Sequence, residues 1–275
     1  MEVCNTRAVA TAARRPARET FMPPALSVVI PAYNEAARVG PYLDAVRNHL
    51  DAAYPADYEV VVVDDGSADD TAGLVRRAAA RWPQLRLVGH PANRGKGAAV
   101  RTGVFAAAGR RVLFADADGA TPITEEWRLS AAVANGAAVA IGSRYTPGPG
   151  VSRSRNVRRA AAGSAFRFAA RSLVGVGVAD TQCGFKMFTA DAARALFTAG
   201  GETGYLFDVE LLALAERFGY GVSEVAINWS EQPGSKVRIV RDSLRMFAGL
   251  WRLRRQMRTV TAPAVATAAA GRKAA

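Results

Sequence analysis

The sequence has few of the residues that cross-link chains or bind transition metals. Of its 275 residues, two are cysteine and two are histidine. Cys4 and Cys183 lie far apart in the chain, which argues against a disulfide framework and fits a reducing compartment. Because there is no Cys-x-x-Cys pair beside His49 and His90, a zinc site is not expected. We interpret both histidines as surface or turn residues.

Long apolar runs are also missing, although half of the residues are hydrophobic. No segment approaches the roughly 20 apolar residues that cross a bilayer, and no apolar stretch follows Arg14 and Arg15 to make a secretory signal. We therefore expect a cytoplasmic protein with one large domain over 26–236 and a basic amphipathic helix over 237–258. The ends, 1–25 and 259–275, are expected to be disordered.

Acidic residues are scarce in two segments, and the formal net charge is +12. Residues 151–175 contain six arginines and no acidic residue, and residues 236–275 contain ten basic residues and one acidic residue. Nucleic acid, an anionic membrane surface and a phosphorylated substrate are candidate partners. The basic segments lack interleaved aromatic residues for stacking on bases, so we expect no nucleic-acid partner.

Short apolar runs alternate with segments of helical spacing. Strands are predicted at 26–31, 58–63, 85–88, 111–115 and 137–141, and helices at 34–50, 67–82 and 97–108. Ser67 with Asp70 resembles a capped start of the second helix. The alternation predicts an α/β fold with a mostly parallel, Rossmann-like sheet and helices on both faces. Ligands of such sheets bind beyond the carboxyl ends of the strands.

Acidic residues follow two of the predicted strands. Asp64 and Asp65 end one strand, and Asp116 and Asp118 follow another, so both pairs are expected at one crevice. Ordinary turn chemistry explains the first pair equally well, whereas we interpret Asp116 and Asp118 as functional. The segment from Gly95 to Gly97 departs from a Walker A loop in its spacing. It predicts either a phosphate site at a helix start or a helix start without a ligand.

Several short motifs occur in an order that resembles a known family. VIPAYNE (29–35), VDDGS (63–67), NRGKG (93–97) and DAD (116–118) resemble family 2 glycosyltransferases of the GT-A fold. DADGAT (116–121), DTQCGFK (180–186), FDVEL (207–211) and GSK (234–236) are similar to the dolichyl-phosphate β-glucosyltransferase branch, beside the polyprenyl-phosphate mannosyltransferases. The resemblance covers roughly 26–255.

The resemblance implies a divalent cation, Mg²⁺ or Mn²⁺, held by Asp118 with Asp116 and bridging to the diphosphate of a nucleotide-sugar. Asp116, Asp118 and Arg144 would be the catalytic residues. The implied nucleotide-sugar residues are Pro31, Tyr33, Glu35, Val63, Asp65, Lys96, Asp116, Ala117, Asp118, Lys186 and Lys236, with Asp65 contacting the base. The mannosyl branch has a glutamine ligand where this chain has Ala120, so water, substrate or another residue must complete the metal shell.

The same resemblance places an acceptor phosphate on Arg144 and on Arg155 or Arg159, although an arginine run is also typical of a solvated helix face. A phosphate monoester is already anionic at neutral pH and needs no general base. A hydroxyl acceptor would need one, and the candidates are Asp180, Asp208, Glu210 and Glu231. Asp180 and Asp208 could equally hold loops in place.

The predicted C-terminal helix has an apolar side and a basic side. It could lie in the membrane interface or pack on the domain. We expect an inverting, metal-dependent transferase at the cytoplasmic membrane face, with or without a membrane-protein partner, moving glucose from UDP-glucose to a polyprenyl or dolichyl phosphate. The alternatives are a mannose, GalNAc or GlcNAc donor, a hydroxyl acceptor, or a non-catalytic nucleotide- or nucleic-acid-binding protein.

Overall fold

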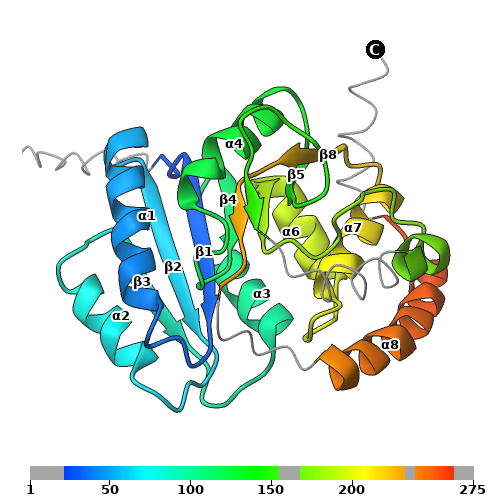
Figure 1. The fold of residues 1–275 in the computed structure, drawn as a ribbon, viewed down its shortest axis with the longest axis horizontal. Coiled ribbons are helices and arrows are strands. Elements are labelled where there is room, and N and C mark those ends of the chain that lie inside the picture. The colour runs from blue at the N-terminus through cyan, green and yellow to red at the C-terminus, as the bar shows by residue number, and fades with distance from the viewer. Residues whose placement is uncertain (1–21, 155–167, 233–238, 263–275) are drawn as a thin grey trace, which may run out of the picture.

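The fold is described from a computed structural model over residues 22–154, 168–232 and 239–262, without the side chains of 154 and 239–247. Strands and helices alternate along most of the chain (Figure 1). Their bounds are β1 Leu26–Ala32, α1 Val39–Ala53, β2 Tyr58–Asp64, α2 Thr71–Ala79, β3 Leu85–Gly89, α3 Lys96–Ala106, β4 Arg111–Ala115, η1 Ile123–Glu125, α4 Glu126–Ala134, β5 Val139–Ser143, β6 Arg153–Ser154, β7 Phe185–Thr189, α6 Ala190–Ala199, α7 Phe207–Arg217, β8 Val222–Ala226, β9 Trp229–Ser230 and α8 Ile239–Thr259.

The main sheet has seven strands in the order β3-β2-β1-β4-β7-β5-β8. Within the part β3-β2-β1-β4, each strand is parallel to its neighbours, and β5 is parallel to β8. Strand β7 is antiparallel to both β4 and β5, with Phe114 of β4 opposite Lys186. The predicted α/β class with a mostly parallel sheet is confirmed. The antiparallel strand inserts the residues of 185–189 between the two parallel parts of the sheet.

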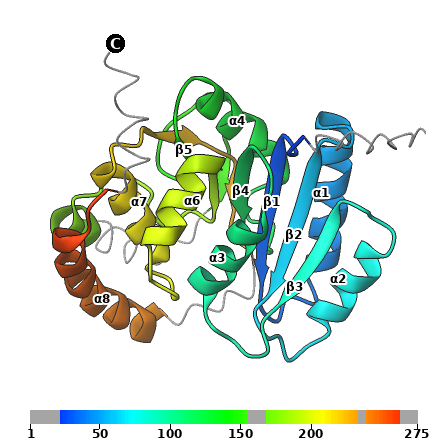
Figure 2. The ribbon, with the colours of Figure 1, turned by 180° about the vertical axis from the view of Figure 1, so that it is seen from behind.

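Helices cover both faces of the sheet, as predicted. One apolar core joins α1, α2 and α4 to the side chains of Val28 and Ile30, and the other joins α3, α6, α7 and α8 to Val29. Figure 1 is seen from the side of α1 and α2, and Figure 2, from behind, brings α3 and α6 forward. Consecutive residues of β1 enter opposite cores because side chains alternate along a strand. Both cores are needed because a central parallel sheet is apolar on both faces.

The predicted strands are confirmed to within two residues, and the start of α3 to within one, whereas the starts of α1 and α2 were predicted too early. Helix α1 begins at Val39, five residues later than predicted, because Asn34 has a positive φ of 52° and its amide donates to Ser67. The capped start at Ser67 was wrong. Helix α2 begins at Thr71, and its N-terminal residue Asp70 makes no side-chain capping bond. The Ser67 hydroxyl joins two loops instead of capping the helix.

The inner ends of both predicted tails make contacts with the domain, so the expectation of disorder is wrong for the residues described there. Ala25 is buried, and its amide donates to Asp57. At the other end, Val260 packs against the second core, and Arg217 donates to its carbonyl. Residues 1–21 and 263–275 lie outside the described part. Among the helices that are described, none combines the length and apolar character needed to cross a membrane.

Candidate active site

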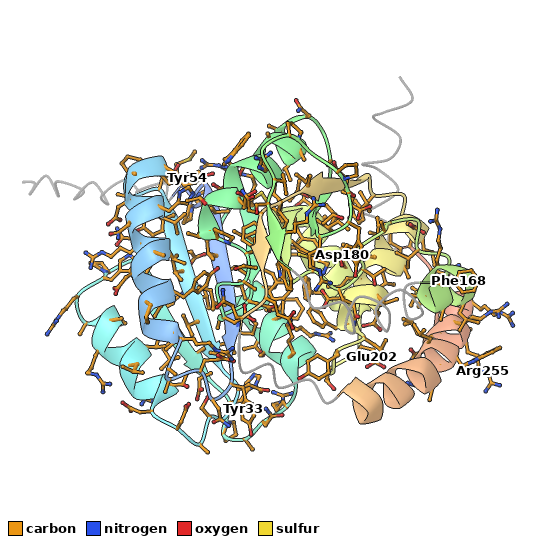
Figure 3. All side chains as sticks on the ribbon, viewed as in Figure 1. Tyr33, Tyr54, Phe168, Asp180, Glu202 and Arg255 are labelled. Carbon is orange, nitrogen blue, oxygen red and sulfur yellow. The ribbon has the colours of Figure 1, made fainter. Side chains whose placement is uncertain are left out.

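A cleft of about 400 Å³ opens at the carboxyl ends of β1, β2 and β4. Its walls come from these strand ends, from the start of α3 and from the loop before α7. The lining residues are Pro31, Ala32, Tyr33, Glu35, Arg38, Asp65, Asn93, Gly95, Lys96, Ala99, Asp116, Ala117, Asp118, Gly204 and Tyr205. Figure 3 labels Tyr33, just past the end of β1, and Glu202, in the loop before α7. The crevice predicted at this edge is therefore present.

Eight of the residues predicted to bind the nucleotide-sugar line this cleft: Pro31, Tyr33, Glu35, Asp65, Lys96, Asp116, Ala117 and Asp118. Val63 is fully buried in β2, two residues before Asp65. Glu35 pairs with Arg38 at 2.5 Å, which places a cation near the mouth of the cleft. Lys236, Arg155 and Arg159 lie outside the described residues.

Asp65 holds the loop that leads into α3. Its carboxylate accepts hydrogen bonds from the amides of Arg94 and Gly95 and contacts the ring of His90 at 2.6 Å. The other ring nitrogen of His90 contacts Thr102 at 2.9 Å. His90 is only 8% exposed, so our interpretation of it as a surface or turn residue was wrong. Its place after β3, at the same edge as Asp65, was the sequence signal for this contact.

The start of α3 is occupied by the chain itself. The Gly95 amide is donated to Asp65, and the Ala98 amide donates to the carbonyl of Thr203. Gly95 has a φ of 100°, and a Cβ there would lie 2.5 Å from that same carbonyl oxygen. Two amides at this helix start are therefore bonded within the chain, and the segment contributes the Lys96 side chain to the cleft.

Lys96 forms an ion pair with Asp116 in the wall of the cleft. Its Nζ lies 2.8 Å and 2.9 Å from the two carboxylate oxygens of Asp116. Burial alone would lower the pKa of Lys96, but the charges of Asp116 and Asp208 raise it overall. Gly184 lies directly behind the carboxylate, since a Cβ on Gly184 would fall 1.9 Å from Asp116 Oδ2. Lys96 therefore stays charged and holds Asp116 in one orientation.

Asp118 has no ion pair like that of Asp116 with Lys96 among the described residues. One oxygen accepts from the Ala120 amide at 3.0 Å, and among the described residues the other oxygen has no hydrogen-bond or ion-pair partner. Burial, followed by the charge of Asp116, raises the pKa of Asp118. No group of three or more metal-ligating side chains occurs in the described part of the chain. Two carboxylates beside a cleft nevertheless fit Mg²⁺ or Mn²⁺, because such ions keep water and substrate phosphate ligands.

Arg144, at the end of β5, is held by Asp180. Two of its nitrogens donate to the two oxygens of Asp180, each at 2.8 Å, and its amide donates to the same carboxylate. The guanidinium also stacks near the Trp229 ring. Burial alone would raise the pKa of Asp180, but Arg144 lowers it. Asp180 therefore orients Arg144, whose side chain remains 22% exposed.

Lys186 is placed differently from its predicted role. It is completely buried on β7, where Nζ lies 2.5 Å from Asp208 and donates to the carbonyl of Cys183. It is not among the residues that line the cleft. Of the candidate bases, Asp208 and Asp180 are engaged in buried ion pairs, and Glu210 accepts from the amides of Gly201 and Glu202. All three carboxylates thus hold structure in place.

Helix α8 packs on the domain. Leu250 and Leu253 are fully buried, and Arg252 pairs with Glu202 at 2.6 Å. Its outer side exposes Trp251, which is 57% exposed, and several arginines, Arg255 among them. In Figures 1 and 2 the helical residues 168–174 run beside α8, and Figure 3 labels Phe168 there. The packed alternative holds for the described part of this helix, which also carries an exposed basic and aromatic side.

Comparison with known proteins identifies relatives over most of the chain. The family description Glycosyl transferase family 2 matches residues 27–197. A human protein named dolichyl-phosphate β-glucosyltransferase is 36% identical over 83% of this chain and 78% of its own length. A Drosophila melanogaster protein of the same name is 39% identical over 83% of this chain and 77% of its own length.

Solved structures share the fold. Glucosyl-3-phosphoglycerate synthase from Mycobacterium tuberculosis, in complex with uridine diphosphate, superposes with a TM-score of 0.65 at 21% identity. The match covers 84% of this chain and 80% of the other. A structure of that same synthase with Mn²⁺, UDP-glucose and phosphoglyceric acid gives a TM-score of 0.64 at 20% identity. These neighbours have the GT-A fold that the sequence predicted.

Proposed function

Because this chain belongs to glycosyl transferase family 2, we propose that it transfers glucose from UDP-glucose to a polyprenyl or dolichyl phosphate with inversion at the anomeric carbon. The relatives named for this activity, at 35% to 39% identity, support the sugar and the acceptor. The observation that carries the proposal is the open carboxylate of Asp118 beside Lys96 and Asp116, in a cleft of about 400 Å³. That is where a nucleoside diphosphate would place its charge.

The metal in this proposal is Mg²⁺ or Mn²⁺, held by Asp118 with Asp116 as the second carboxylate. When bound, the cation would act as a Lewis acid that stabilises the negative charge developing on the departing diphosphate. Lys96 keeps the Asp116 carboxylate oriented and adds positive charge on the same side of the cleft. Structural neighbours that were solved with Mn²⁺ and UDP-glucose support this assignment.

On the acceptor side, the Arg144 guanidinium binds the acceptor phosphate and Asp180 fixes its direction. The acceptor oxygen is anionic at neutral pH because the second pKa of a phosphate monoester is about 6. No side chain then has to remove a proton before attack on the anomeric carbon. This agrees with Asp180, Asp208 and Glu210 being engaged in ion pairs or loop hydrogen bonds.

We place the protein on the cytoplasmic face of a membrane, bound peripherally. The exposed side of α8 and the neighbouring residues 168–174 supply the contact, with Trp251, Phe168 and Arg255 pointing to solvent. Aromatic side chains favour the headgroup region. Basic residues near an anionic surface contribute about 1 kcal/mol each.

The test is a transfer assay with purified protein, UDP-[14C]glucose, Mn²⁺ and a polyprenyl phosphate in detergent, followed by extraction of labelled glycolipid. Asp118→Asn should reduce the transfer rate about a thousand-fold, because several kcal/mol of charge stabilisation in the transition state is lost. Asp44→Asn, an exposed position on α1, is the matched control and should be unchanged. Product from a hydroxyl acceptor but not from the lipid phosphate would refute the acceptor, and a fully active Asp118→Asn would refute the metal site.

A further inference from the structure

One buried hydroxyl near Asp118 has no hydrogen-bond partner among the described residues. Tyr42, on α1, is 7% exposed, and its Oη has no hydrogen-bond partner in the described part of the chain. A buried polar group left unpaired costs about 1–3 kcal/mol, so most such groups in folded proteins are paired. A phenylalanine would fill the same space in α1 without that penalty. We therefore expect this hydroxyl to gain a hydrogen-bond partner when a ligand binds nearby.

The surroundings of Tyr42 point to the carboxylate pair. Its ring packs against Gly119, where a Cβ would lie 3.3 Å from a ring carbon and where φ is 67°. Tyr42 also lines a second cavity of about 460 Å³ together with Arg38, Asp118 and Gly119. Asp118 and Arg38 line both cavities. Tyr42 thus lines a cavity that shares Asp118 with the first cleft.

The hydroxyl can only act as a donor toward this pair. The usual pKa of a tyrosine phenol is about 10, so the hydroxyl carries its proton at neutral pH. A protonated hydroxyl facing carboxylates donates its hydrogen to a carboxylate oxygen. Asp118 has such an oxygen without a partner among the described residues.

We propose that Tyr42 is a positioning residue of the metal site, which donates a hydrogen bond to a carboxylate oxygen of the Asp116–Asp118 pair once a divalent cation is bound. The inference rests on the metal site of the proposed function. Carboxylates that bind metals are commonly oriented by such hydrogen bonds, and removing one typically reduces metal affinity 10- to 100-fold.

The experiment is a titration of the full-length protein with Mn²⁺ in the presence of UDP, followed by electron paramagnetic resonance of bound and free metal. Tyr42→Phe should weaken Mn²⁺ binding about ten-fold and change the spectrum of the bound ion. Tyr220→Phe, in the turn before β8, is the matched control and should bind as the parent does. Without metal, Tyr42→Phe should be at least as stable to urea as the parent, because an unpaired polar group has been removed.

Each outcome decides the inference. If the parent and Tyr42→Phe proteins bind Mn²⁺ equally well, the inference about Tyr42 is wrong. The proposed metal site is not affected by that result. A parent protein that binds no Mn²⁺ overturns both. A metal-free Tyr42→Phe protein that is less stable, or does not fold, also overturns the inference, since the hydroxyl would then have a partner within the protein. Tyr42→Met, a second apolar replacement, should show the same loss of affinity as Tyr42→Phe.

Discussion

Two lysine–aspartate pairs lie near Phe114 and differ in what surrounds them. Lys96 and Asp116 line the cleft, with side chains 24% and 32% exposed. Lys186 and Asp208 are 0% and 4% exposed, between β7 and α7. The Lys96 ammonium lies 5.3 Å from the centre of the Phe114 ring, and Lys186 stands opposite Phe114 in the sheet. The same two residue types thus occur at neighbouring positions with different access to a ligand.

The difference shows how burial separates a binding pair from a structural pair. Solvent and a ligand can reach Lys96 and Asp116, so either group can exchange its partner for a metal or a phosphate. Lys186 and Asp208 have no such alternative, and each depends on the other for its charge. Burial raises the pKa of Asp208 in spite of the nearby ammonium. The variants described below test this comparison.

Removing the buried lysine should have the largest effect. Lys186→Ala leaves Asp208 without its partner in the core, and we expect the free energy of unfolding to fall by about 3–5 kcal/mol, measured by urea denaturation. The double variant Lys186→Met/Asp208→Leu removes both charges and should recover most of that stability. If Lys186→Ala is as stable as the parent but loses transfer activity, Lys186 belongs with the binding residues.

Removing the cleft lysine should affect the transfer rate more than the free energy of unfolding. Lys96→Met is expected to slow glucosyl transfer about a hundred-fold, because a cation beside the diphosphate stabilises charge in the transition state. Its free energy of unfolding should change by less than about 1 kcal/mol, as for other solvent-accessible pairs. Both quantities are measured on one preparation. A large loss of stability with normal transfer would break the distinction between the pairs.

A third ion pair, Arg144 with Asp180, extends the comparison to the acceptor side. Asp180→Asn should destabilise the protein at pH 7 by about 1–3 kcal/mol and raise the KM for polyprenyl phosphate more than it lowers kcat. Because Arg144 lowers the pKa of Asp180, its ionised form stabilises the fold above about pH 4, the usual pKa of aspartate, and this contribution is lost as the pH falls through the lowered pKa.

The measurement for Asp180→Asn is urea denaturation of parent and variant at several pH values. The difference in stability should shrink below about pH 4. Asp44→Asn serves as the control, because Asp44 is exposed on α1. A difference that stays constant with pH would mean that the charge of Asp180 is not what holds Arg144.

The smallest effect is expected from a methyl group behind Asp116. Gly184→Ala would place a Cβ 1.9 Å from Asp116 Oδ2, so the carboxylate must turn away from its present position. We expect transfer to slow about ten-fold, because a displacement of this kind misaligns the charges around the diphosphate. Gly201→Ala, where the added Cβ meets nothing within 4 Å, is the matched control. Equal rates for both variants would show that the orientation of Asp116 is not critical.

Local patterns in the sequence predicted the strands and the edge at which the cleft opens. The apolar runs at β1, β2 and β4 are short and nearly continuous, and acidic residues directly follow two of them, so strand positions and the convergence of Asp65, Asp116 and Asp118 could be expected. The starts of α1 and α2 could not. They depend on contacts between loops, such as the Asn34 amide with Ser67, and no local pattern contains such a contact.

The sequence by itself determined the α/β architecture, the family and the carboxylates at the cleft, because hydrophobic periodicity and short motifs are local properties. Only the tertiary structure decided which lysine faces the cleft, that His90 and Asp65 meet, that Asp180 holds Arg144, and that the Tyr42 hydroxyl stands unpaired beside Asp118 within the described chain. Burial and pairing depend on residues brought together from distant segments. The charge and reactivity of a side chain follow from those neighbours, so residue type alone could not assign these roles.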